Sequence, residues 1–152
     1  MVHLYNLTLQ KSSGINAAVY GNFSASKAQE IVVLRNKVVE LLRPDESGRV
    51  QSVTSVEAFG IARSIATLRL AGANRDYLVL GSDSGRVVVL QFDKEKNAFV
   101  KVHQETYGKT GCRRIVPGQF LCADPKGRAI CLGAVEKNKL VYVMNRDNES
   151  NL

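Results

Sequence analysis

A strand–turn–strand pattern occurs three times along this chain of 152 residues, and it constrains the fold more than any other feature. In each copy a short run of Val, Leu and Ile ends at a polar turn, and a second apolar run follows. The copies span residues 30–42, 76–90 and 129–144. Matched leucines in the three copies are 46 and 52 residues apart: Leu34, Leu80 and Leu132. A period of this length indicates a repeat architecture.

The first copy taken alone also fits a helix. Its apolar residues fall at helical spacing, Ser26 could cap the start, and Pro44 could mark the stop. Its many β-branched residues favour two strands instead. The second copy decides between these readings, because its turn Asp83-Ser84-Gly85 cannot lie inside a helix. There we expect Asp83 to bond local backbone amides and Gly85 to adopt a positive φ.

Additional strands complete each unit. We expect a strand before each hairpin and a fourth strand after the first two hairpins, at 17–23, 64–70, 114–120, 50–59 and 98–106. Four strands in about 40–50 residues are typical of a β-propeller blade. The predicted fold is therefore all-β, a WD-repeat-like β-propeller with about three four-stranded antiparallel blades. Because propellers close with about 4–8 blades, we expect an incomplete ring.

The whole chain, residues 1–152, reads as a single region without an internal linker. The polar residues 145–152 are predicted to be a frayed end or the route to a next blade. No apolar run approaches the length of about 20 residues that a membrane span requires. The first ten residues lack the features of a secretory signal, so we expect a soluble intracellular protein with no membrane partner.

The net charge of +7 permits contact with RNA, DNA or an acidic protein, although the basic residues are scattered. The cysteines Cys112, Cys122 and Cys131 show no metal-binding spacing and no disulfide framework. We predict that Cys122 and Cys131 are small buried apolar residues. No metal and no cofactor is expected.

Motifs that suggest catalysis are incomplete. Gly108-Lys109-Thr110 resembles the end of a phosphate-binding loop, but the earlier glycine and the following helix are missing. Gly81 to Gly85 has Asp83 where a nucleophile elbow needs serine. No pair of carboxylates is spaced for acid–base chemistry. We therefore expect no enzyme activity.

The least generic segment, residues 103–120, carries two adjacent cations and a nearby lysine. Neighbouring residues of a strand point to opposite faces. One arginine could thus pair with an acid between blades while the other meets a partner, or both could be solvated. The candidate partner-binding residues are Lys109, Arg113 and Arg114.

Several long segments resemble one known protein family. They include the start Leu4–Gln10, Gly21–Ser24, Gly81–Arg86, Gly111–Phe120 and Asp124–Arg128. On these residues the chain is similar to the amino-terminal part of the splicing factor 3b subunit 3 family. That family is related to the large subunits of the damaged-DNA-binding complex and of the cleavage and polyadenylation factor. The related proteins are not expected to carry Gly111–Phe120 in this form.

The resemblance implies a nuclear, non-catalytic scaffold within the U2 small nuclear ribonucleoprotein (U2 snRNP), which supports branch-site recognition in pre-mRNA splicing. Implied partners are the HEAT-repeat large subunit and small subunits of splicing factor 3b. RNA contact is possible, and we expect indirect contact in preference to direct contact. It also implies that this chain corresponds to the first blades of a much longer protein. Two alternatives stay open: a ubiquitin-ligase adaptor or DNA-damage-binding propeller, and a direct RNA-binding module.

Overall fold

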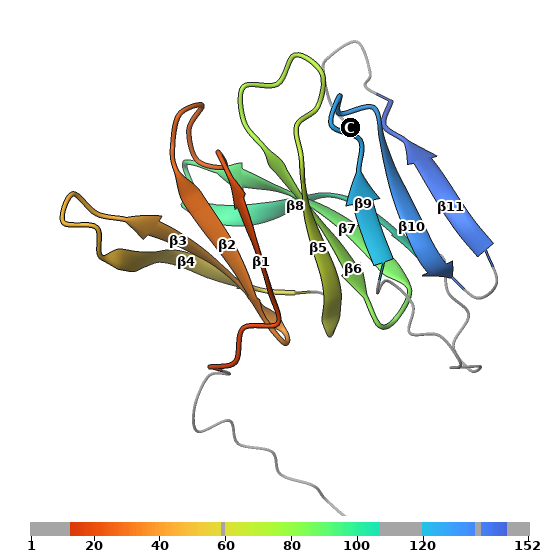
Figure 1. The fold of residues 1–152 in the computed structure, drawn as a ribbon, viewed down its shortest axis with the longest axis horizontal. Helices are drawn as coiled ribbons and strands as arrows, with labels where there is room; N and C mark the ends of the chain where they lie inside the picture. The colour runs from red at the N-terminus through yellow and green to blue at the C-terminus, as the bar shows by residue number, and fades with distance from the viewer. Residues whose placement is uncertain (1–12, 59, 107–119, 136–137, 146–152) are drawn as a thin grey trace, which may run out of the picture.

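The computed structural model describes residues 13–58, 60–106, 120–135 and 138–145 as three antiparallel sheets (Figure 1). The described residues form no helix, so none is long enough to cross a membrane. The all-β propeller prediction is confirmed, and the ring is not closed. The strands, in chain order, are β1 (Ala17–Gly21), β2 (Glu30–Arg35), β3 (Val38–Pro44), β4 (Val50–Glu57), β5 (Ala62–Leu68), β6 (Tyr77–Ser82), β7 (Arg86–Asp93), β8 (Ala98–Thr106), β9 (Phe120–Ala123), β10 (Ala129–Val135) and β11 (Asn138–Val143).

Each sheet is a simple meander whose strands pair in chain order. The first sheet holds β1 to β4, the second β5 to β8, and the third β9 to β11. Most of the strand expected at 114–120 lies outside the described residues; within them β9 is Phe120–Ala123, so the strand continues past the expected end at Phe120. Pairing decides this boundary, because Ala123 is in register with Ile130 of β10.

Tight turns confirm the hairpin interpretation of the first two copies. Asn36 takes a positive φ of 57° between β2 and β3, a conformation that asparagine tolerates better than most residues. Gly85 takes a φ of 74° between β6 and β7, as predicted. Among the described residues Ser82 rather than Asp83 bonds the amides of this turn: its carbonyl accepts from the Gly85 amide at 3.0 Å and its Oγ accepts from the Arg86 amide at 3.3 Å.

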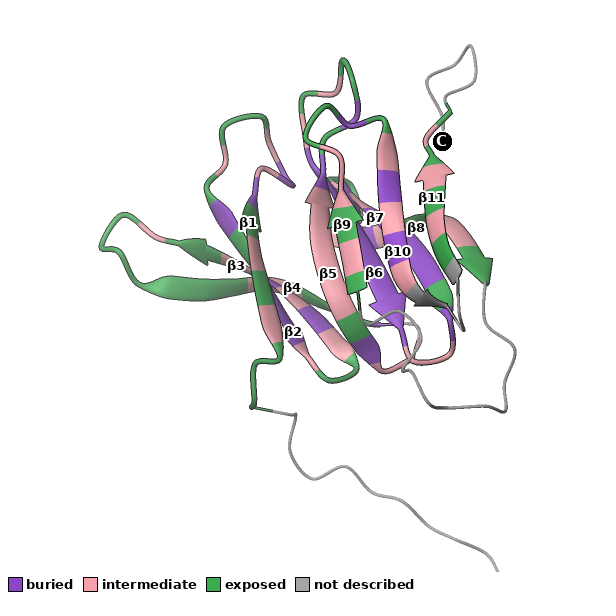
Figure 2. Cartoon of the chain, turned by 45° about the vertical axis from the view of Figure 1, so that its right-hand side comes forward, coloured by how far each residue is buried: buried purple, intermediate pink, exposed green. Residues whose placement is uncertain are grey.

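The core lies between the sheets rather than within them. Successive side chains of a strand point to opposite faces, so β6 is buried on both sides (Figure 2). Leu78 and Leu80 pack toward the first sheet, in a cluster that includes Leu34. Tyr77 and Val79 join a second cluster toward the third sheet. The middle sheet is thus buried on both faces by its two neighbours.

The first strand of each sheet, β1, β5 and β9, lies next to its counterpart in the neighbouring sheet (Figure 1). The loops that follow these strands reach the same end of the molecule, at the top of Figure 1. The third-to-fourth-strand loops of the first two sheets lie at the matching ends of their sheets, because the meander alternates direction, and they project to the left in Figure 1. We call this surface the upper loop end: residues 22–29, 45–49, 69–76, 94–97 and 124–128, together with Arg43 at the adjoining end of β3.

Candidate protein interface

The partner-binding residues predicted from sequence, Lys109, Arg113 and Arg114, all lie outside the described residues. So does the Gly108-Lys109-Thr110 segment. The described part of the chain presents a different set of charged groups. At the upper loop end, one arginine in each sheet is held by a carboxylate of the same sheet.

Glu30 is the most enclosed of these carboxylates, because its side chain has no exposure. It accepts hydrogen bonds from the amides of Phe23 and Ser24, at 3.0 and 2.8 Å, and from the Ser24 hydroxyl at 2.7 Å. Arg43 donates from Nε at 3.1 Å and from Nη2 at 2.5 Å. Burial alone would raise the pKa of Glu30, but these donors, led by the Ser24 amide, hold it below its ordinary value. The ionised carboxylate therefore organises the loop after β1.

Asp76 joins the first sheet to the second. Its Oδ2 accepts from the Asn22 amide at 2.7 Å, and its own amide donates to the Asn22 carbonyl at 2.9 Å. Arg69 donates to both carboxylate oxygens, from Nε at 2.7 Å and from Nη2 at 3.0 Å. Nη2 also donates to Asn22 Oδ1 at 2.6 Å. Hydrogen bonding to Asp76 raises the pKa of Arg69, so its guanidinium stays charged.

The third pair, Asp124 and Arg128, flanks a tight turn. Arg128 donates from Nε at 2.6 Å and from Nη2 at 3.4 Å, which lowers the pKa of Asp124 to about 2. Gly127 in this turn has a φ of 68°, and a Cβ placed there would collide with the carbonyl oxygen of Arg69. The turn therefore sits directly against the loop of the second sheet.

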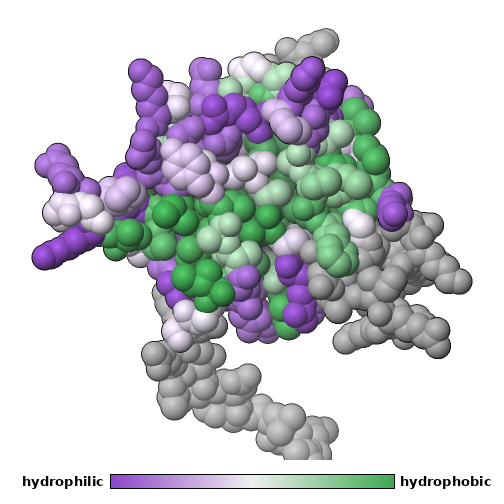
Figure 3. Space-filling view, in the orientation of Figure 1, coloured by the Kyte–Doolittle hydropathy of each residue, from purple (hydrophilic) through white to green (hydrophobic). Residues whose placement is uncertain are grey.

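The three pairs share one orientation. The arginine side chains are 45%, 45% and 66% exposed, whereas their carboxylates are only 0%, 8% and 21% exposed. Each guanidinium is held through Nε and Nη2, and within the described residues its Nη1 makes no hydrogen bond. Negative charge thus lies inside and positive charge outside. Figure 3 shows hydrophilic side chains along this end and apolar ones across the middle of the same face.

Sequence reasoning missed these pairs because their partners are separated by 13, 7 and 4 residues, with no common spacing. The available signal was positional. Each loop after a first strand is bordered by an acid, with Glu30 and Asp76 at the end of their loops and Asp124 at the start of its loop, and an arginine lies elsewhere in the same unit. Recognising it would have required aligning the three units at that loop.

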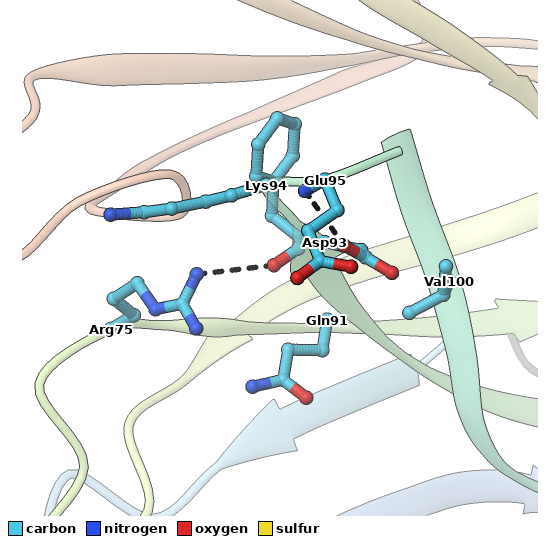
Figure 4. Close-up of a pocket in the computed structure, with 7 residues that line it drawn as sticks. Arg75, Gln91, Asp93, Lys94, Glu95 and Val100 are labelled. Carbon is cyan, nitrogen blue, oxygen red and sulfur yellow. Dashed lines mark hydrogen bonds between the residues drawn. The ribbon is translucent and has the colours of Figure 1, made fainter. Parts of the chain in front are cut away.

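Two surface hollows each include an arginine, Arg128 in one and Arg75 in the other. One, of about 290 Å³, lies where the second and third sheets meet; it is lined mainly by apolar residues, with Arg128 as its charged member. Its walls are Leu70, Ala71, Gly127, Arg128, Val143 and Met144. The other, of about 300 Å³, is polar and contains Arg75, Lys94, Asp93 and Glu95 (Figure 4). There Arg75 Nη1 donates to the Phe92 carbonyl at 3.2 Å, so this arginine contacts the end of β7, next to the β7–β8 loop.

The outer face of the third sheet presents apolar side chains to solvent. Phe120, Val141 and Val143 are 61%, 69% and 59% exposed. Cys122 lies opposite Cys131 on this face, where Cys122 is exposed and Cys131 half-buried. The prediction that both cysteines are buried is therefore wrong, because the described residues place no further sheet over this face.

One further contact connects the second and third sheets at their outer strands. The Tyr142 hydroxyl on β11 and His103 Nε2 on β8 are 2.7 Å apart. Burial raises the pKa of Tyr142, and the nearby Glu105 carboxylate adds to the effect. No group of three or more potential metal ligands gathers in the described part of the chain. The polar groups found here connect sheets and present charge.

Comparison with known proteins places these observations in a family. Residues 14–152 match the model described as RSE1/DDB1/CPSF1 first beta-propeller. The chain is 61% identical over 151 residues to Spliceosome-associated protein 130 A of Arabidopsis thaliana. It is 58% identical over 150 residues to Splicing factor 3B subunit 3 of Danio rerio, and 54% identical over 152 residues to Pre-mRNA-splicing factor RSE1 of Mycosarcoma maydis. The alignments cover 98–99% of this chain but only 12% of each relative.

Proposed function

Because this chain belongs to the RSE1/DDB1/CPSF1 first β-propeller family, we propose that it supplies the first three blades of a propeller scaffold in pre-mRNA splicing. The names of its relatives support the splicing role, since they are a spliceosome-associated protein, a splicing factor 3B subunit and a pre-mRNA-splicing factor. The scaffold acts in the nucleus without catalysis.

The exposed apolar face of the third sheet carries this proposal. A blade normally buries both faces against neighbours, as the middle sheet does here through Leu78 and Val79. Phe120 and Val141 instead face solvent. The chain spans 12% of the length of the relatives it matches, which leaves ample sequence for further blades. On this proposal the residues beyond Asn145 lead into the next blade.

The proposed partners are the HEAT-repeat large subunit and small subunits of splicing factor 3b, within the U2 snRNP. Contact is protein–protein, and the scaffold supports branch-site recognition without itself reading RNA. The low aromatic content of 7% and the absence of tryptophan favour this reading, because single-stranded RNA is bound largely by stacking on aromatic side chains. Lys109, Arg113 and Arg114 remain proposed contact residues.

The test is affinity capture from nuclear extract, with and without nuclease, using the tagged chain and the tagged full-length protein in parallel. We expect the full-length protein to retain the HEAT-repeat subunit after nuclease treatment, as mass spectrometry would show. Recovery of cullin components instead would indicate that the protein is a ubiquitin-ligase adaptor or DNA-damage-binding propeller. Loss of all splicing proteins on nuclease treatment would contradict a protein-bound scaffold.

A further inference from the structure

We propose that the apolar hollow between the second and third sheets, with Arg128 in its wall and Arg69 in the adjoining loop, binds an acidic protein segment that carries an apolar side chain. The inference concerns the upper loop end and the adjoining Val143 and Met144, and it does not depend on the splicing role. It rests on the orientation of the two guanidinium groups, the lining of the hollow and the distribution of exposed charge.

The guanidinium groups are held in place before any partner arrives. Asp76 and Asn22 fix Arg69 through Nε and Nη2, and Asp124 fixes Arg128 through the same two atoms. An arginine that is already ordered loses less side-chain entropy on binding than a free one. Nη1 of each makes no hydrogen bond to another described residue, so it can donate to an incoming carboxylate in a charge-assisted hydrogen bond.

The hollow supplies the apolar part of the recognition. Leu70 directly follows Arg69 in the chain, and Arg128 is itself part of the wall. Val143 and Met144 complete an apolar lining, and the close approach of Gly127 to Arg69 keeps the two loops together. A volume of about 290 Å³ accommodates one side chain of leucine size. A partner segment would therefore place an apolar residue between two acidic ones.

Charge at this end favours an acidic protein over RNA. The exposed cations outnumber the exposed acids, because Glu30 and Asp76 are buried beneath their arginines. Glu46 and Glu95 are nevertheless exposed among the same loops and would repel a continuous phosphate backbone. Phe23 is the only aromatic residue of the upper loops described here, and it is buried, so these loops offer no base-stacking platform.

The test measures fluorescence anisotropy of a labelled peptide, Ser-Glu-Glu-Leu-Glu-Glu-Ser, against the whole chain. The double variant Arg69→Lys with Arg128→Lys keeps the net charge but removes the Nη1 donors. We expect it to weaken binding about tenfold. The matched control, Arg63→Lys with Arg86→Lys, makes the same exchange at the opposite end of the second sheet and should leave affinity unchanged. Equal thermal midpoints by circular dichroism would show that folding is intact.

A second variant tests the hollow without touching an ion pair. Ala71 is exposed and lines the hollow, so Ala71→Phe should fill it without disturbing the core. The wild-type chain should prefer the leucine peptide to one with alanine at that position, and Ala71→Phe should abolish the preference. Absence of peptide binding, equal losses in the test and control arginine variants, or binding of oligouridine in place of the peptide would each overturn the proposal.

Discussion

Gly127 shows how one residue position can hold two blades together. Its backbone adopts a φ of 68°, and its α-carbon lies so close to the Arg69 carbonyl that no side chain fits. Gly72, in the neighbouring loop, has a similar φ of 79° but open space around it. Comparing alanine substitutions at the two glycines therefore separates the cost of backbone strain from the cost of a steric clash.

We predict that Gly127→Ala lowers the free energy of unfolding by at least about 2 kcal/mol, because strain and a steric clash add. Gly72→Ala should cost about 1 kcal/mol, since only the left-handed backbone is affected. Urea denaturation followed by circular dichroism measures both. Equal losses would show that the contact between the Gly127 turn and Arg69 contributes nothing.

Glu30 makes stability depend on pH. Its folded-state pKa lies below the ordinary value of 4.5, so it stabilises the fold above that pH and the contribution disappears as pH falls through the folded pKa. We expect Glu30→Gln to cost about 2 kcal/mol at neutral pH, because Phe23, Ser24 and Arg43 lose an ionised acceptor that is itself fully buried. The variant should also flatten the acid side of the stability profile.

The control for Glu30 is Glu46→Gln, in an exposed loop of the same sheet. It should change the free energy of unfolding by less than about 0.5 kcal/mol at any pH. Chemical denaturation across the acid range compares the two variants. If the free energy of unfolding of Glu30→Gln depended on pH as it does in the wild type, ionised Glu30 would not be the source of this pH dependence.

At the scale of the strand, position within a sheet decides how much each apolar residue contributes. Val39 on β3 is fully buried in the cluster between the first and second sheets. Val50 begins β4 and is exposed. Both have the same intrinsic strand propensity, so they differ only in burial and packing.

Val39→Ala is expected to reduce stability by about 2 kcal/mol, from lost burial and the cavity left behind. Val50→Ala should cost less than about 0.5 kcal/mol. Thermal or urea unfolding would compare them. Similar losses would mean that the first two sheets do not stack through this face.

At the scale of the molecule, three stacked sheets leave an uncovered apolar surface. The second sheet is enclosed on both faces, whereas the third presents Phe120, Val141 and Val143 to solvent. Exposed apolar patches of this kind mark a surface that associates with another. In the longer relatives, a following blade is the proposed occupant.

Val141→Lys should reduce self-association of the chain without lowering its thermal midpoint, because Val141 is 69% exposed. Light scattering and analytical ultracentrifugation measure the association. Val50→Lys is the control, since it adds the same charge on the first sheet. If both variants reduce association equally, net charge rather than the open face is responsible.

The strands and hairpins could be predicted from sequence because their causes are local. β-branched runs, polar turns and a glycine at a positive φ act over a few residues, so the turn between β6 and β7 and the bounds of β8 agree with the prediction. The repeat of four-strand units then indicated a propeller. The end of β9 was the exception, since it depends on register with β10; the start of the expected strand lies outside the described residues.

The candidate interface could not be predicted in the same way. Asn22 meets Asp76 across 54 residues and Arg69 meets Asn22 across 47, and only the stacking of sheets brings them together. Whether Cys122 is buried likewise depends on what covers its sheet. Sequence by itself determined the elements and their repeat, because short-range sterics and side-chain alternation set them. The tertiary structure alone decided which charges pair and which faces stay open, because those depend on contacts between sheets.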